Sequence, residues 1–202
     1  MTVIGLTGPT GSGKGVLAEA FRKQGIPVLD TDAVYHEWIA HPSPCVDELV
    51  DAFGESVRGA DGGIDRPALA AVVFCGTAAG EERLALLNSI THRYVIKSIW
   101  VWLKEQEKDK KRCAVIDAPL LFEAGVDRIC DKVIAVIAPA ELRLARIMMR
   151  DGISEPRARA RIQAQKSDDF YTTRAQFVFV NDGAPTAANA FALDVINRLP
   201  LV

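Results

Sequence analysis

The sequence predicts an α/β fold in which helices cover both faces of a central parallel sheet. Apolar runs of strand length alternate with segments of helical spacing, which is the order that builds such a sheet. The runs at 113–117 and 132–138 do not alternate with polar residues, as is typical of parallel strands buried on both faces. A glycine-rich segment at 8–13 separates the first apolar run from the first helical pattern. In a sheet of this kind, ligands bind beyond the carboxyl ends of the strands.

The N-terminal part follows this order. The β-branched run at 2–7 predicts the first strand. Apolar side chains at helical spacing over 16–21, with Gly25 placed as a C-terminal cap, predict the first helix. The next elements expected along the chain are a short strand at 27–29, a helix at 33–40 and a break at Pro42 and Pro44.

The middle of the chain shows little strand signal. A loop is expected at 59–63, followed by separate helices around Leu69 and Val73, around Leu84, Leu87 and Ile90, and from Val95 to Leu103. This block, about 60–110, is interpreted as a helical insertion between strands of the core.

Strands return in the last part of the chain, where five are expected in total. The expected elements are strands at 113–117 and 132–138, two helices divided at 152–154, a last strand at 177–180, and a final helix with Phe191, Val195 and Leu199 on one face. The core is thus expected at about 1–58, 112–139 and 176–202 of a single domain.

Composition excludes several classes of protein. The 202 residues carry 24 Lys and Arg against 26 Asp and Glu, a net charge of −2, which excludes a strongly basic nucleic-acid binder. The sequence holds neither the apolar run of about 20 residues that a membrane span requires nor a secretory signal at its N-terminus. Four cysteines without a C-x-x-C pair favour reduced, mostly buried thiols in a cytoplasmic protein.

Residues 8–14 fit the pattern G-x-x-x-x-G-K of a P-loop. Small residues let successive backbone N–H groups point inward at phosphate oxygens, and the following helix adds its positive N-terminal end. The candidate phosphate-binding residues are Gly8, Gly11, Ser12, Gly13, Lys14, Gly15 and Val16. Lys14 supplies a point charge for the β and γ phosphates. The hydroxyl that usually follows the lysine and binds Mg²⁺ is missing at Gly15, which moves the metal onto water, nucleotide and other carboxylates.

Carboxylates follow two of the strands. Asp30 and Asp32 come after the second strand, where an aspartate could accept the proton of an attacking hydroxyl or hold Mg²⁺ through water, or could simply begin a helix. Asp117 ends the third strand, the usual place for an acid that orients a metal, and could equally be an ordinary loop residue. Glu123 is either a substrate contact or a solvated surface residue.

A basic segment lies at 141–166, with seven basic and three acidic residues and a local charge of +4. Arginine forms bidentate contacts with phosphate, so a basic lid can neutralise a phosphoryl group in transfer. Arg146 and Arg150 are four residues apart and share a helix face. A solvated, salt-bridged helix is the alternative for each arginine. Single histidines such as His36 and His92 are more often structural than catalytic.

The chain resembles the dephospho-coenzyme A kinases, which are P-loop kinases of the nucleoside-monophosphate-kinase type. The resemblance spans nearly the whole chain. Its motifs are the strand and P-loop at 4–14, V-L-D-T-D at 28–32, F-G at 53–54, D-G at 61–62, D-R at 65–66, L-N at 87–88 with His92, D-A-P-L-L-F-E at 117–123, R-D-G at 150–152 with Arg146, Arg161 and Gln165, and N-D-G at 181–183.

The resemblance implies a P-loop NTPase fold, a three-layer α/β/α arrangement with a helical insertion that binds CoA at about 60–110 and a lid at about 140–165. It implies transfer of a phosphoryl group from ATP, with Mg²⁺, to the ribose 3′-hydroxyl of dephospho-CoA. Asp32 is then the base, and Lys14 and Arg146 assist catalysis. ATP is expected to contact the P-loop through Val16 with Arg146, Arg150 and Asn181, the substrate to contact Asp32, His36, Arg66, His92, Leu120 and Glu123, and Asp117 to hold Mg²⁺ through water.

Two positions depart from the family's pattern. Gly15 replaces its usual serine, and His36 stands where the family usually has an arginine, so slower or more pH-dependent turnover is expected. Two alternatives stay open: a kinase of another small acceptor such as a nucleoside monophosphate, and a nucleotide-binding regulatory protein without catalysis. Partners are expected to be small molecules, with no nucleic acid and no membrane, for a monomer or small homo-oligomer.

Overall fold

The computed structural model describes residues 1–74, 78–184 and 186–199, so the expectation for Cys75 lies outside the described residues. The chain divides into two compact units. Unit 1 comprises Met1–Asp30 and Leu103–Val202, and unit 2 comprises Thr31–Trp102. None of the helices in the described part of the chain combines the length and apolar character needed to cross a membrane.

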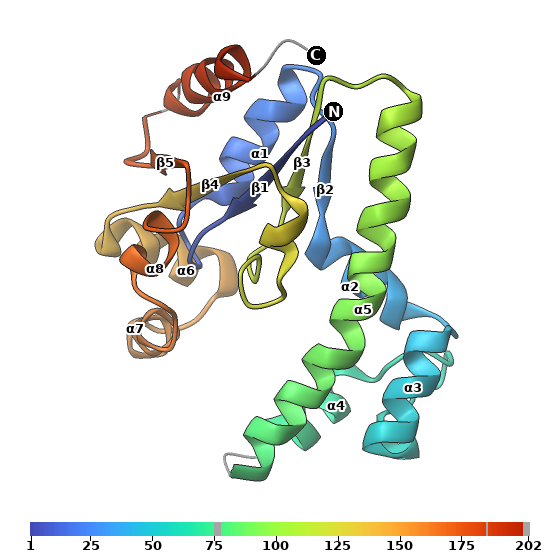
Figure 1. The fold of residues 1–202 in the computed structure, drawn as a ribbon. Coiled ribbons are helices and arrows are strands. Elements are labelled where there is room, and N and C mark those ends of the chain that lie inside the picture. Colours follow the sequence, from blue (N-terminus) through green and yellow to red (C-terminus); the bar gives the residue numbers. More distant parts are fainter. Residues whose placement is uncertain (75–77, 185, 200–202) are drawn as a thin grey trace. The chain divides into compact units, whose positions relative to one another are not determined.

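Unit 1 is built on a five-stranded sheet in which every pairing is parallel. In spatial order the strands are β2 (Val28–Asp30), β3 (Cys113–Asp117), β1 (Thr2–Thr7), β4 (Lys132–Ile137) and β5 (Phe177–Val180) (Figure 1). The expected α/β class and parallel five-stranded sheet are therefore confirmed. Because all strands are parallel, their carboxyl ends meet at one edge, where the P-loop, Asp30 and Asp117 lie.

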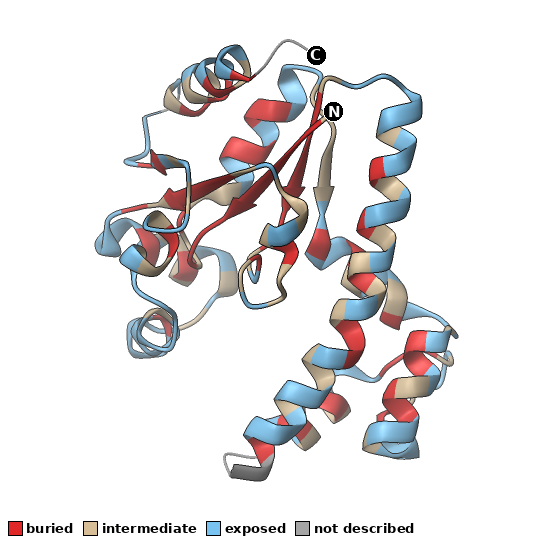
Figure 2. Ribbon diagram, in the orientation of Figure 1, coloured by how far each residue is buried: buried red, intermediate tan, exposed pale blue. Residues whose placement is uncertain are grey.

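One face of this sheet packs against α1 (Lys14–Lys23) and α9 (Ala187–Arg198). Side chains two residues apart point to the same face of a strand, and β1, β3 and β4 are red along most of their length in Figure 2. The strand residues in this core are Ile4, Leu6, Cys113, Val115, Ile134, Val136 and Phe179. The expected burial of Cys113 is confirmed, and Cys45 is buried in unit 2.

The rest of unit 1 consists of short helices. They are the 3-10 helix η2 (Val126–Ile129), α6 (Ala140–Asp151), α7 (Glu155–Gln163) and α8 (Asp168–Thr172). The expected division of α6 from α7 is confirmed, because Gly152 has a φ of +63° and ends α6. Helix α8 was not expected, since five residues are too few to show a helical period.

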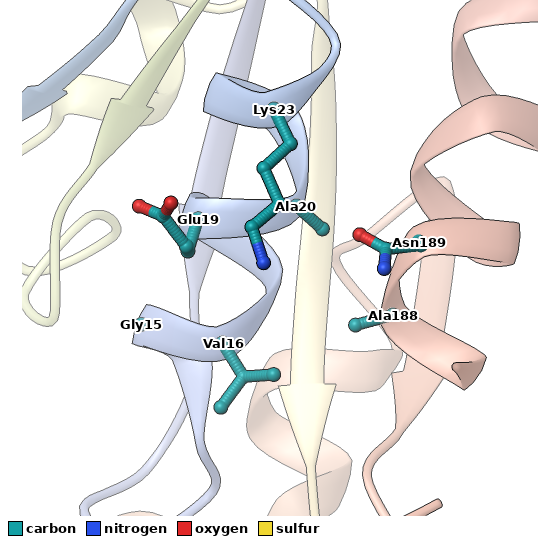
Figure 3. Close-up of a pocket in the computed structure, with 7 residues that line it drawn as sticks. All are labelled: Gly15, Val16, Glu19, Ala20, Lys23, Ala188 and Asn189. Carbon is teal, nitrogen blue, oxygen red and sulfur yellow. The ribbon is translucent and has the colours of Figure 1, made fainter. Parts of the chain in front are cut away.

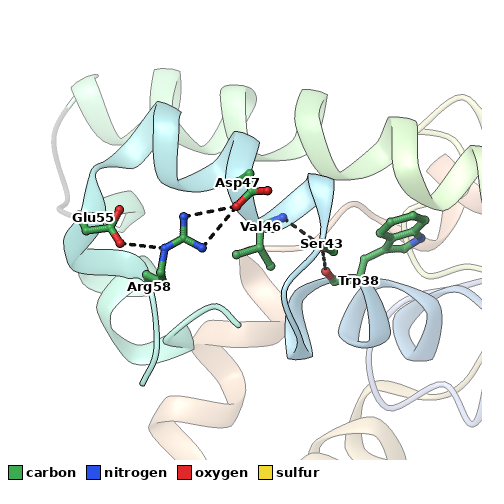
Figure 4. A network of polar contacts seen from close by, with 6 residues as sticks. All are labelled: Trp38, Ser43, Val46, Asp47, Glu55 and Arg58. Atoms are coloured by element: carbon green, nitrogen blue, oxygen red, sulfur yellow. Dashed lines mark hydrogen bonds and ion pairs between the residues drawn. The ribbon is translucent and has the colours of Figure 1, made fainter. Parts of the chain in front are cut away.

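Unit 2 is helical, with α2 (Thr31–Ala40), α3 (Pro44–Phe53), the 3-10 helix η1 (Glu55–Val57), α4 (Arg66–Val73) and α5 (Ala78–Lys108), whose last six residues belong to unit 1. Helix α3 begins where only a break was expected. The Ser43 hydroxyl accepts the Val46 N–H at 3.2 Å and donates to the Trp38 carbonyl at 2.6 Å (Figure 4). Pro44 occupies the first helical turn, where its missing N–H costs nothing.

Helix α5 is one continuous helix where two were expected, because no glycine or proline interrupts residues 81–108. Ile39, Val46, Leu69 and Ile90 come from four helices and share one core. Unit 2 therefore starts at Thr31, whereas the sequence placed the start of the helical insertion near residue 60, since α2 and α3 pack into the same core as α4 and α5.

Candidate active site

The P-loop conformation depends on glycine. Gly8, Gly11 and Gly13 all have positive φ angles. At Gly11, a Cβ atom would lie 2.8 Å from the backbone oxygen of Arg143, so helix α6 packs directly on the loop. Gly13 has a φ of +84° and precedes the first turn of α1, which contains no acidic residue. The loop therefore presents backbone N–H groups at a helix N-terminus, which suits an anion.

Lys14 forms an ion pair with Asp117. Asp117 ends β3, and its position in the sheet register is opposite Leu6, just before the P-loop. The two side chains are only 17% and 8% exposed, so the carboxylate and the ammonium group neutralise each other where they are largely shielded from solvent. The structure thus brings together the lysine that the sequence placed in the P-loop and the aspartate that it placed at the end of the third strand.

Arg146 and Asn181 support the P-loop from outside. Arg146, on α6, donates through Nη1 to the carbonyls of Gly11 and Ser12, both at 3.2 Å. The buried amide of Asn181, directly after β5, donates to the Ser12 carbonyl at 2.9 Å and accepts from Arg146 at 3.4 Å. Both residues were expected at the ATP site, and both contact the backbone of the phosphate loop.

Arg143 was not among the candidate site residues predicted from the sequence. Its side chain is 7% exposed, and its Nε donates to the Thr10 carbonyl at 3.0 Å. Its other nitrogens donate to Gln165 at 3.2 Å and to Asp168 at 3.3 Å. The sequence offers one weak signal for it, which is its position one helical turn before Arg146.

Arg150 is exposed and binds Asp151 through two hydrogen bonds of 2.7 and 3.0 Å. The hydrogen bond from Arg150 lowers the pKa of Asp151, and Arg161 adds a second ion pair to the same carboxylate. Arg150 also lies 3.4 Å from the Thr10 hydroxyl, at the tip of the loop. An incoming phosphate would have to compete with Asp151 for this guanidinium.

Leu120 and Glu123 lie in the turn that follows β3, and both are exposed. The Thr7 hydroxyl donates to the Pro119 carbonyl at 3.2 Å, which ties this turn to the end of β1. The two candidate substrate contacts therefore stand at the same edge of the sheet as the P-loop.

The other candidate substrate residues belong to unit 2. Asp32 and His36 are exposed on α2, Arg66 is the first residue of α4, and His92 is half-buried on α5. Burial lowers the pKa of His92, so this imidazole is neutral near pH 7. Asp32 lies in the first turn of α2, two residues after β2 ends.

A groove of about 550 Å³ lies within unit 2, and Arg66 is one of the residues that line it. Tyr35, Pro67, Leu69, Ala70, Val73, Phe74 and Leu87 line the rest of it. The wall is mainly apolar, and burial raises the pKa of the Tyr35 hydroxyl, which stays a neutral donor. One guanidinium beside an apolar wall suits a ligand that carries both an anionic group and a long aliphatic part.

A second pocket of about 320 Å³ opens beside the first turns of α1 (Figure 3). Gly15 and Val16 line it together with Ala188 and Asn189 of α9. Val16 shares the apolar helical spacing of α1, but its side chain is 55% exposed and faces this pocket. Apart from its chain neighbours and the backbone of its own helix, no atom of the described residues lies within 4 Å of the place where a Cβ of Gly15 would stand.

The donor set of the site fits Mg²⁺ bound largely through water. Among the described residues, no group of three or more His, Cys, Asp or Glu side chains could hold a metal by itself. Asp117 is a buried carboxylate at the strand edge, and Mg²⁺ usually keeps several waters while it binds one or two carboxylates and nucleotide phosphates.

A glycine loop that caps the first helix of a parallel sheet, with its lysine paired to the acid of the adjacent strand, places this chain among the P-loop kinases. The profile of the dephospho-CoA kinase family matches residues 2–186. The chain belongs to this family.

Individual relatives agree with this assignment. A dephospho-CoA kinase from Moorella thermoacetica is 40% identical over 94% of this chain and 88% of its own length. The relative of the same name from Corynebacterium glutamicum is 36% identical over 98% of both chains. The activity of the family is the ATP-dependent phosphorylation of dephospho-CoA, the final step of CoA biosynthesis, and the chain is a kinase enzyme.

Solved structures show the same fold. The crystal structure of TT1252 from Thermus thermophilus has a TM-score of 0.80 and 32% identity, and the match covers 99% of this chain and 98% of that one. Dephospho-CoA kinase from Campylobacter jejuni has a TM-score of 0.69 at 24% identity, over 96% and 95%. Shikimate kinase from Acinetobacter baumannii shares the fold alone, with a TM-score of 0.52 at 14% identity, over 99% and 96%.

Proposed function

We propose that this chain transfers the γ-phosphoryl group of ATP to the ribose 3′-hydroxyl of dephospho-CoA and releases ADP and CoA. The observation that supports the phosphate end is the P-loop lysine, which is held at the carboxyl edge of the sheet by Asp117. In this reaction the bond from the 3′-oxygen to the γ-phosphorus forms while the bond to the β-phosphate oxygen breaks.

At the phosphate end, backbone N–H groups of the segment from Gly11 to Val16 would bind the β and γ phosphates. The N–H groups of Ser12 and Val16 donate to the carbonyls of Pro9 and Gly13, at 3.2 and 2.9 Å, before ATP binds. Lys14 would exchange its contact with Asp117 for a contact with the phosphates, because the triphosphate brings more negative charge than one carboxylate. A point charge at this place stabilises the negative charge that spreads over the transferring group. Arg150 would add charge at the tip of the loop.

At the acceptor end, Asp32 would take the proton of the 3′-hydroxyl. The role needs an acceptor oxygen within hydrogen-bond reach of the hydroxyl. An exposed carboxylate in the first turn of α2 is accessible to a substrate. His36 beside it on α2 would contact the acceptor by hydrogen bonding, without the permanent charge of an arginine.

The groove of unit 2 would hold part of dephospho-CoA. Its apolar wall suits the aliphatic arm of the substrate, and the Arg66 guanidinium suits one of its phosphates. His92, on α5, and Leu120 and Glu123, after β3, would add contacts. This assigns acceptor binding to the helices of unit 2, in place of the narrower block at 60–110, and leaves residues 140–165 as the lid.

Mg²⁺ would be held by Asp117 through water and by the nucleotide. When bound, it would neutralise charge on the phosphates. The partners are proposed to be small molecules, and the net charge of −2 supports the absence of nucleic-acid binding. We also propose that the protein is cytoplasmic and a monomer or small homo-oligomer.

The test is an assay of the purified protein with Mg-ATP and a panel of acceptors. CoA and ADP should form from dephospho-CoA, and nucleoside monophosphates should give no turnover. Phosphorylation of a nucleoside monophosphate alone would favour the other acceptor class, and tight ATP binding without ADP release would favour a regulatory protein. Arg66→Gln should raise the KM for dephospho-CoA about tenfold and leave the KM for ATP unchanged. The exposed Arg22→Gln is its matched control.

A further inference from the structure

Three successive carbonyl groups of the P-loop are each held by a side chain from outside the loop. Arg143 donates to the Thr10 carbonyl at 3.0 Å, and Arg146 donates to the Gly11 carbonyl at 3.2 Å. The Ser12 carbonyl accepts from both Arg146 at 3.2 Å and Asn181 at 2.9 Å.

These contacts determine where the backbone N–H groups point. In a trans peptide the C=O of one residue and the N–H of the next point in opposite directions, and no peptide bond is cis in the described residues. A Thr10 carbonyl held outward by Arg143 therefore turns the Gly11 N–H toward the inside of the loop. The same reasoning applies to the Gly13 N–H, which follows the Ser12 carbonyl.

Side chains hold both the N–H and the carbonyl of Thr10. Its N–H donates to Gln165 Oε1 at 2.8 Å, and the same oxygen accepts from Arg143 at 3.2 Å. The third nitrogen of the guanidinium donates to Asp168 at 3.3 Å. All three nitrogens of Arg143 are therefore used within the protein, and its side chain is 7% exposed. This arginine is not placed to bind phosphate itself.

We propose that Arg143 is a positioning residue for ATP binding, which works with Gln165 to hold the Thr10 peptide so that the Gly11 N–H faces the phosphates. The inference rests on the proposed function only in that the P-loop binds ATP. It assigns to the chain segment after α7 a direct part in shaping the loop. Preorganised donors of this kind bind charge without a reorganisation cost at the moment of binding.

The experiment measures the Kd for ADP by calorimetry in the absence of dephospho-CoA, and then both KM values. Arg143→Met should weaken ADP binding about tenfold to hundredfold, because a charge-assisted hydrogen bond to phosphate loses its alignment. Arg143→Lys should lie between this variant and the unchanged chain, since one ammonium can reach Thr10 but cannot also bind Gln165 and Asp168. The KM for dephospho-CoA should stay constant. A general loss of structure would change both KM values.

Gln165→Leu is the second variant. Gln165 is exposed, so this change should leave folding intact and weaken ADP binding about twofold to tenfold. Arg198→Gln removes an exposed arginine paired with Asp194 and is the matched control, with unchanged affinity. Unchanged ADP binding in folded Arg143→Met and in Gln165→Leu would overturn the inference. If Arg143→Met does not fold, the ADP affinity of Gln165→Leu is the deciding measurement. Weaker ADP binding in a chain that never phosphorylates dephospho-CoA would instead refute the proposed acceptor alone.

Discussion

The ion pair between Lys14 and Asp117 predicts that one substitution harms both activity and stability, and that a second substitution repairs only stability. Lys14→Met removes the cation and keeps the length of the side chain. The Asp117 carboxylate, 8% exposed, then loses its compensating charge. Asp117→Asn in the same chain replaces that carboxylate with a neutral amide of the same shape.

The magnitude follows from burial. Removal of one partner of a buried ion pair costs about 3–5 kcal/mol, because the other charge remains without compensation. The Lys14 side chain is 17% exposed, so water reaches its end of the pair and the lower figure applies. We expect Lys14→Met to lower the free energy of unfolding by about 3 kcal/mol, and the double variant to recover most of this loss. Both variants should lose about 10²–10³ in turnover rate, because each lacks the electrostatic donor of Lys14.

The assay is urea unfolding followed by circular dichroism at pH 7.5, with the phosphorylation rate of dephospho-CoA measured in parallel. Lys23→Met, an exposed lysine on the same helix, serves as the control and should change neither quantity. The reasoning fails if Lys14→Met is as stable as the unchanged chain, or if the double variant is no more stable than Lys14→Met.

Three further outcomes are expected. Asp32→Asn should lower kcat by about 10²–10⁴ while the Kd for ATP stays constant, and full activity would exclude Asp32 as the base. Gly15→Ser should fold normally, because no atom of the other described elements lies within 4 Å of the new Cβ. It should lower the Mg²⁺ concentration that gives half-maximal rate, and an unchanged Mg²⁺ titration would contradict this. His92 has a pKa below its value in the unfolded chain, so the unfolded state gains a proton first as the pH falls. Stability from this residue is complete above about pH 6.5 and declines below it, and His92→Gln should show a smaller loss of urea midpoint between pH 7.5 and 5.5.

The strands could be predicted well from sequence because their signal is local. The run at 177–180 coincides with β5, and the runs at 2–7 and 113–117 coincide with β1 and β3. The continuity of α5 could not be predicted from its apolar spacing, which breaks into two patterns. The absence of glycine and proline over residues 81–108 is the signal that indicates a single helix there.

The candidate site likewise has one part that could be predicted from the sequence and one part that could not. The P-loop is a short motif whose spacing carries its own chemistry, so the sequence was enough to locate Lys14 and the glycines. Arg143 is one of seven basic residues in its segment, and only tertiary packing shows that it is buried against the loop while Arg150 is exposed. Burial of a single arginine depends on partners such as Gln165 and Asp168, more than twenty residues away.

The position of β1 in the sheet has a consequence for how the chain folds during synthesis. The first strand pairs with β3, where Thr2 lies opposite Cys113, and with β4, where Ile4 lies opposite Lys132. Both partner strands are synthesised more than a hundred residues later. The apolar first strand therefore stays unpaired for on the order of 5–20 s during synthesis. Unit 2 and its own core are synthesised within that interval. The nucleotide loop therefore takes its shape late, and the first strand is exposed to aggregation or chaperone binding in the nascent chain until its partners are made.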